Sequence, residues 1–128
     1  MKRIISFIII AGLFLTGCSD SDTQHYYYEA FSITKSNYNS ISYPNFQNIS
    51  FETMKDYRDK LRNKMSEFLG SGTDATEDEI FELLTSRGCS AHDANIILDF
   101  LNSNGNFVID FNHAYDSNLY IILYLEKL

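Results

Sequence analysis

The side chains with the most obvious capacity for chemistry do not form a recognisable catalytic arrangement. Cys89, His92 and Asp93 bring a thiol, an imidazole and a carboxylate close together in the sequence. At a predicted helix start, however, the neighbouring acids would raise the thiol pKa, and no oxyanion donor accompanies them. The chain also lacks a G-x-S-x-G elbow, a phosphate-binding loop and a dinucleotide fingerprint. We therefore predict that the protein is not an enzyme and needs no cofactor.

The histidines and acids do not have the spacing of metal ligands either. His25, His92 and His113 are far apart, without the i, i+4 or C-x-x-C spacing of metal sites, and we expect them at the surface. Neither the acidic stretch at 74–82 nor the Asn-rich stretch at 102–106 matches a calcium-binding loop, which needs a glycine at its sixth position. We predict no metal site.

One predicted helix carries a concentration of cations. They are interleaved with acids, and Asp56 and Lys60 form a favourable i, i+4 pair. One interpretation is a solvated helix face, and the other is a local basic patch for an acidic partner or an anionic glycan. These cations are Lys55, Arg58, Lys60, Arg62 and Lys64.

Tyrosines recur in the first and last predicted strands. Because alternate residues of a strand share a face, Tyr26 and Tyr28 could lie beside Tyr120 and Tyr124 on an open face of a sheet. Tyrosine offers a large, stiff contact area with a polar tip, as recognition surfaces require. These four residues are the candidate binding surface, and the alternative is a half-buried face that the 34–50 connection shields.

The first residues form an export signal. Lys2 and Arg3 precede an apolar run at 4–15, which is shorter than a membrane-spanning helix. The segment resembles the lipobox of bacterial lipoproteins, carried here by Leu15, Thr16, Gly17 and Cys18. The resemblance implies that residues 1–17 are a signal peptide and that Cys18 receives a diacylglycerol and often an N-acyl chain. It implies an anchor outside the cytoplasm, and Ser19 in place of Asp favours the outer membrane of a diderm organism.

Composition limits what remains after the leader. Removing residues 1–17 from the 128-residue chain leaves 111 residues, which is enough for one domain. Loss of Lys2 and Arg3 takes the formal charge from −7 to −9, which disfavours nucleic acid and favours a basic partner. With Cys18 lipidated, Cys89 has no partner within the chain, and we expect it to be buried and inert.

The patterns along the mature chain predict one α+β domain at 26–128 after a tether at 18–25. A strand covers 26–33, residues 34–50 form an irregular connection, and a helix capped by Ser50 covers 51–69. Gly70 and Gly72 end this helix. Two more helices begin after Thr76 and Ser90, each with a capping-box acid three residues on.

The C-terminal part completes the predicted sheet. Residues 107–111 alternate, 113–118 form a turn, and 119–125 are apolar on both faces, which is typical of a central strand. We predict three helices on one face of a three-stranded antiparallel sheet, in the order β-α-α-α-β-β. Residues 76–125 resemble a winged helix-turn-helix. The second helix of this segment, at 91–101, has no Lys or Arg but carries Asp93 and Asp99. We therefore predict that this part of the fold is a scaffold and does not bind DNA.

These observations favour a lipid-anchored envelope protein that binds a protein or a glycan. The alternative is an inhibitor or immunity lipoprotein that neutralises an exported toxin or a cell-wall hydrolase, many of which are basic.

Overall fold

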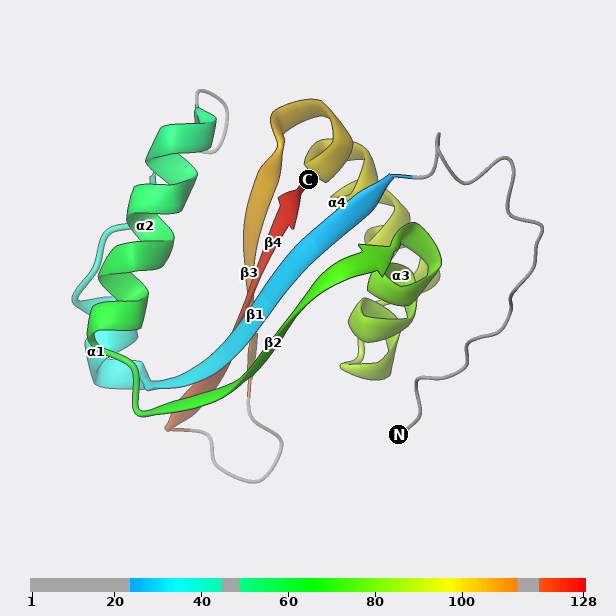
Figure 1. The fold of residues 1–128 in the computed structure, drawn as a ribbon. Coiled ribbons are helices and arrows are strands. Elements are labelled where there is room, and N and C mark those ends of the chain that lie inside the picture. Colours follow the sequence, from blue (N-terminus) through cyan, green and yellow to red (C-terminus); the bar gives the residue numbers. More distant parts are fainter. Residues whose placement is uncertain (1–23, 45–48, 113–117) are drawn as a thin grey trace.

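The computed structural model describes residues 24–44, 49–112 and 118–128, which form an α+β domain around one open antiparallel sheet (Figure 1). Within these residues the sheet has four strands in the order β2-β1-β4-β3. The α+β class is confirmed, whereas the predicted three strands and three helices differ from the fold. The strands are β1 (His25–Thr34), β2 (Glu67–Thr76), β3 (Asn106–Asn112) and β4 (Leu119–Lys127), and the helices are α1 (Lys35–Asn39), α2 (Phe51–Asn63), α3 (Glu77–Ser86) and α4 (Ala91–Asn104).

The helices cover both faces of the sheet, and the predicted single helical layer is wrong. α1 and α2 lie on one face, and α3 and α4 lie on the other (Figure 1). Glu29 of β1 meets Arg58 of α2, while its neighbour Tyr26 meets Asn102 of α4 on the opposite side. The physical reason is β4, in which residues 121–125 are all buried and therefore need an apolar layer on each face.

The predicted helix at 51–69 is too long. α2 ends at Asn63, and β2 follows from Glu67 as a strand paired with β1. The backbone N–H of Ser66 donates to the carbonyl of Ser32 at 2.7 Å, and Phe68 lies opposite Phe31. Hydrogen bonds to β1 thus replace the helical bonds that residues 66–68 would otherwise make.

Helix starts follow local signals and are confirmed. Ser50, Thr76 and Ser90 each accept a hydrogen bond from the backbone N–H three residues later. The predicted capping box of α3 forms in both directions, since Glu79 also accepts from the N–H of Thr76 at 2.8 Å. α4 ends at Gly105, whose φ of 99° is a left-handed conformation that glycine adopts without strain.

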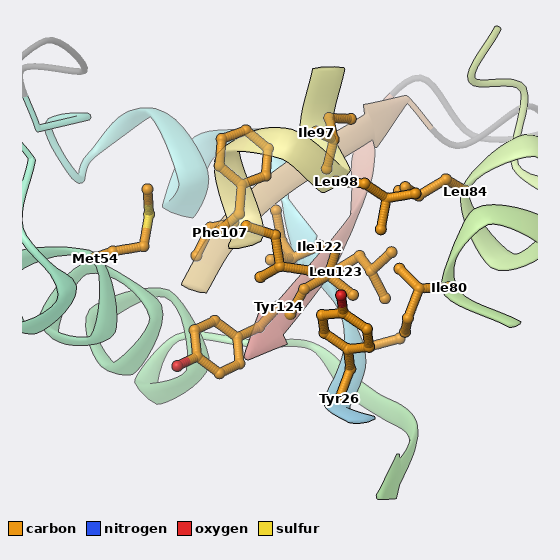
Figure 2. Packing of buried hydrophobic residues seen from close by; sticks show 14 of the residues in the cluster. Tyr26, Met54, Ile80, Leu84, Ile97, Leu98, Phe107, Ile122, Leu123 and Tyr124 are labelled. Atoms are coloured by element: carbon orange, nitrogen blue, oxygen red, sulfur yellow. The ribbon is translucent and has the colours of Figure 1, made fainter. Parts of the chain in front are cut away.

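β4 is a central strand, as predicted, because it pairs with β1 on one side and β3 on the other. The helix–helix–hairpin order of the winged helix-turn-helix is present in α3, α4, β3 and β4, but β1 and β2 extend this hairpin into a larger sheet. The core lies against both faces of β4 and includes Ile122 and Leu123 (Figure 2).

β1 begins one residue before the predicted strand at 26–33. His25 belongs to β1, and its carbonyl accepts a hydrogen bond from the N–H of Leu128 at 2.9 Å. The Gln24 side chain donates to the carbonyl of Leu128 at 2.8 Å. The leader, Cys18 and most of the 113–118 turn lie outside the described residues.

Candidate protein-interaction site at the edge of the sheet

The four tyrosines predicted to form one open face lie on two different faces. Residues opposite each other in a ladder share a face, and Tyr124 lies opposite Glu29, whereas Leu125 lies opposite Tyr28. Tyr120 and Tyr124 therefore face α1 and α2, and Tyr26 and Tyr28 face α3 and α4. The predicted common surface is wrong because the pairing of β1 with β4 sets Leu125, and not Tyr124, opposite Tyr28, which puts the tyrosines of the two strands on opposite faces.

Each of these tyrosines is at least partly covered. Tyr26 and Tyr124 are fully buried, and their rings point in different directions (Figure 2). The Tyr26 hydroxyl donates to Asn102 at 2.5 Å, and the Tyr120 ring lies 4.6 Å from that of Tyr38 in α1. The Tyr28 ring lies across Gly72, where an added Cβ would come within 2.6 Å of it. These rings are packing elements of the sheet.

A buried ion network attaches α2 to the sheet. The Glu29 carboxylate is fully buried in β1 and accepts a hydrogen bond from Arg58. Arg62 also reaches Glu29, at 3.3 Å, and both arginines bond Asp59. The Arg58 guanidinium lies 4.4 Å from the centroid of the Tyr124 ring, which adds a cation–π contact.

The network leaves little of the predicted basic patch. Arg58 is buried and Arg62 is half-buried, and both contact Glu29 and Asp59, while Lys60 is paired with Asp56 at 3.2 Å. Burial raises the pKa of Asp59, but the hydrogen bonds and charges of Arg58 and Arg62 outweigh burial and hold that pKa below its usual value. The helix thus combines the predicted solvated face with a buried anchor that the sequence pattern did not indicate.

A second group of tyrosines packs where α1 and α2 meet the sheet. The Tyr43 ring stands edge-on to Tyr57, with centroids 5.0 Å apart. Burial, followed by a hydrogen bond to Asp110, raises the pKa of Tyr38, and burial raises the pKa of Tyr43 to about 12. Phenols with raised pKa values stay protonated at neutral pH, so these groups act as hydrogen-bond donors and ring surfaces.

The Cys89 thiol has a raised pKa, as expected beside acidic residues, but its side chain is not fully buried. It is half-buried in the α3–α4 turn, and burial together with the charge of Asp93 raises its pKa. His92 is exposed, and the His25 ring bonds the carbonyl of Asp74 at 3.1 Å. His113 lies outside the described residues. Among the described residues, no group of three or more His, Cys, Asp or Glu side chains is placed to hold a metal ion.

A shallow hollow of about 430 Å³ lies between the segment after α1 and the last turns of α2. Among the described residues, two lysines line it and no Cys, His or carboxylate does. The lining residues are Ser40, Ile41, Ser42, Lys60, Asn63 and Lys64.

The most conspicuous exposed apolar feature is the first half of β2. Phe68 and Leu69 retain 47% and 43% of their accessible area, and the preceding Met65 retains 37%. In the described chain, no strand pairs with the outer edge of β2. We call Met65, Phe68 and Leu69 the apolar edge surface. Side chains of this size are usually covered, so their clustering beside an open strand edge indicates an interaction site.

Acidic side chains continue along the same stretch of chain. Residues 65–86 contain no Lys or Arg, and each of their acids is exposed. This segment therefore combines an apolar patch with a strongly negative flank. The acids are Glu67, Asp74, Glu77, Asp78, Glu79 and Glu82.

Sequence reasoning missed the apolar edge surface because it placed these residues on the buried face of a helix. A local signal was present: Glu67–Thr76 contains two glycines and two threonines, and glycine is unfavourable inside a helix.

In the part of the chain that the structure describes, no helix has the length and apolar character needed to cross a membrane. Comparison of the chain with protein-family models, curated protein sequences and solved structures found no match.

Proposed function

We propose that this protein is a lipid-anchored, non-enzymatic component of the cell envelope that binds a protein partner through the apolar edge surface. The observation that carries this proposal is the first half of β2, where Phe68 and Leu69 remain exposed beside a strand edge that no other described strand pairs with. An exposed edge and apolar side chains are what an incoming polypeptide can bury. The burial of Tyr26 and Tyr124 removes the aromatic face on which a glycan partner would depend.

The start of β1 and the apolar edge surface lie toward opposite ends of the sheet. Gln24 is six residues after Cys18, so an extended tether reaches about 20 Å at most. The tether joins the start of β1, whereas Glu67 lies opposite Ser32 near the end of that ten-residue strand, roughly 23 Å away. A lipid on Cys18 would therefore attach the domain through the end of the sheet that is farther from the apolar edge surface, and leave that surface available to a partner.

Substitution of the lipidation site tests the anchor. We expect the Cys18→Ser protein to lose metabolic labelling by palmitate and to leave the membrane fraction. The wild-type protein should be released only by detergent, because two or more acyl chains hold a protein firmly in a bilayer. Recovery of the Cys18→Ser protein in the membrane fraction, with its labelling intact, would contradict a lipid anchor at this residue.

Site-specific cross-linking tests the partner surface. A photoreactive amino acid is placed at Phe68 in the full-length protein, and a matched one is placed at Ile96, an exposed apolar residue of α4. We expect a discrete protein adduct from position 68 alone, and we expect Leu69→Glu to abolish it. Equal adducts from both positions, or an adduct insensitive to Leu69→Glu, would count against this surface.

The acidic flank favours a second candidate, an inhibitor or immunity lipoprotein directed at a cationic exported protein. Six exposed acids without a cation in residues 65–86 create a field that attracts a basic partner. The test is to measure the activity of the protein captured at position 68, with and without the purified domain. Inhibition relieved by Phe68→Glu supports this role, and undiminished activity at saturating domain argues against it.

A further inference from the structure

We infer that the partner supplies an extended segment that joins the outer edge of β2 as a fifth strand, with a cationic side chain toward each end and apolar side chains between them. This inference rests on the proposed function, and it specifies the chemistry of the partner at that same surface.

The outer edge of β2 has the requirements for strand addition. Among the described strands, β2 pairs only with β1, along one edge, so part of its backbone N–H and C=O groups point outward. The strand is ten residues long, enough to pair with a segment of ordinary strand length. An incoming strand would satisfy these backbone groups and cover Phe68 and Leu69 in one step.

The charges at the two ends of β2 specify the ends of the incoming segment. Glu67 and Asp74 are exposed and seven positions apart, and the residues between them carry no charge. β2 has a second irregularity at Asp74, whose φ is 62° and which has no residue opposite it on β1. A strand lying beside β2 would therefore place one side chain opposite Glu67 and another near the turn at Asp74, about 20 Å away at the usual rise per residue. Lysine or arginine at those two positions forms favourable cross-strand pairs.

The middle of the edge has room for apolar side chains from the partner. A Cβ added at Gly70 would meet no atom within 4 Å, and its neighbour Leu69 is exposed. Leu69 also lies at a register shift, without a residue opposite it on β1. Such a bulge bends the strand edge, and a flat strand of arbitrary sequence pairs poorly with a bent edge. The segment that binds must therefore fit this shape.

A second copy of this chain does not fit the same edge. Antiparallel pairing of two β2 strands centred between Gly70 and Ser71 would set Glu67 of one copy opposite Asp74 of the other. Like charges directly opposite each other in a ladder are destabilising. The net charge of −7 for the full chain further opposes self-association.

Two synthetic peptides test this inference directly on the intact, soluble Cys18→Ser protein. Each peptide has about ten residues of alternating valine and threonine, a length matched to one strand. One carries Lys, and the other carries Glu, at the two positions expected to face Glu67 and Asp74. Binding is measured by fluorescence anisotropy, and its location by amide NMR shifts and hydrogen exchange.

We expect the Lys peptide to bind about tenfold more tightly than the Glu peptide and to protect outward-facing amides of β2 from exchange. The double variant Glu67→Lys/Asp74→Lys should reverse the preference, while the control Asp93→Lys/Asp99→Lys, on α4, should not. Equal binding of both peptides, or protection of amides elsewhere, overturns strand addition. Cross-linking through Phe68 would still succeed in that case if the proposed function alone is correct, so the two failures are distinguishable.

Discussion

Glu29 in the middle of β1 and Arg58 in α2 form an ion pair whose carboxylate has no exposure to solvent. Arg58 has a second acid partner, Asp59 at 2.7 Å, and its guanidinium stacks on Tyr124. The pair attaches the α1–α2 layer to the same strand that pairs with β2. A buried, charged carboxylate destabilises the fold unless a cation is paired with it. The Glu29–Arg58 contact is therefore needed to hold α2 against the sheet.

Removal of one partner should therefore destabilise the domain. We expect Glu29→Gln to lower the free energy of unfolding by about 3 kcal/mol, because it leaves the Arg58 charge without its buried partner. Urea denaturation followed by circular dichroism measures this change. Asp56→Asn, which breaks the exposed pair with Lys60, is the control and should cost less than about 0.5 kcal/mol. Similar costs for the two variants would contradict a structural role for the Glu29–Arg58 pair.

The same network predicts that the stability of the domain depends on pH in the acidic range. The pKa of Asp59 is lowered in the folded protein, so its stabilising contribution is complete above its unfolded pKa, near 4, and disappears as the pH falls through the folded value. We expect the stability difference between the wild type and Asp59→Asn to be larger at pH 6 than at pH 3. Urea midpoints at the two pH values measure it, and Asp99→Asn, an exposed carboxylate of α4, corrects for net charge. A difference that does not change with pH would contradict the prediction.

Sequence reasoning succeeded for the fold where the determinants are local. The start of α3 depends on Thr76 and Glu79, three residues apart, and β4 shows its central place by being apolar on both faces. β2 was missed because Met65, Phe68 and Leu69 have a spacing that also fits a helix. The strand conformation of Phe68 and Leu69 depends on pairing with β1, more than thirty residues away, and short-range periodicity contains no information about that pairing.

The candidate site could be predicted less well, for a related reason. Exposure of Phe68 is a property of strand order, since β2 would have a covered edge if another strand followed it in the sheet. The prediction of a common tyrosine surface was wrong because the sequence does not show how β1 and β4 align. A shift of one residue in that alignment moves every side chain of a strand to the other face. The acids near β2 were visible in the sequence. Their proximity to an apolar patch became evident only when residues 67–76 were placed at the sheet edge.

Two glycines with nearly the same positive φ should differ in their tolerance of alanine. Gly88 and Gly105 have φ values of 100° and 99°, but only at Gly105 would a new Cβ contact another side chain, at 2.9 Å from Phe51. We expect Gly88→Ala to cost about 1 kcal/mol through backbone strain alone. Gly105→Ala should cost about 1–3 kcal/mol more, since Phe51 must also move. Thermal and urea unfolding compare the two variants, and equal costs would contradict the packing at Gly105.

Substitutions at Phe31 and Phe68, which lie opposite each other, should distinguish a residue that packs in the core from one that binds a partner. Phe31 is fully buried and Phe68 is 47% exposed, although the two are neighbours across the β1–β2 ladder. We expect Phe31→Ala to lower the unfolding free energy by about 3–5 kcal/mol, whereas Phe68→Ser should cost about 1 kcal/mol or less.

Phe68→Ser should nevertheless lose the partner that cross-links at the apolar edge surface. Because position 68 is altered in this variant, the photoreactive amino acid is moved to Leu69, with the otherwise wild-type protein as its control. Normal folding combined with lost capture assigns Phe68 to recognition. A large loss of stability from Phe68→Ser would instead assign this residue to the core and remove the main support for an interaction site on β2.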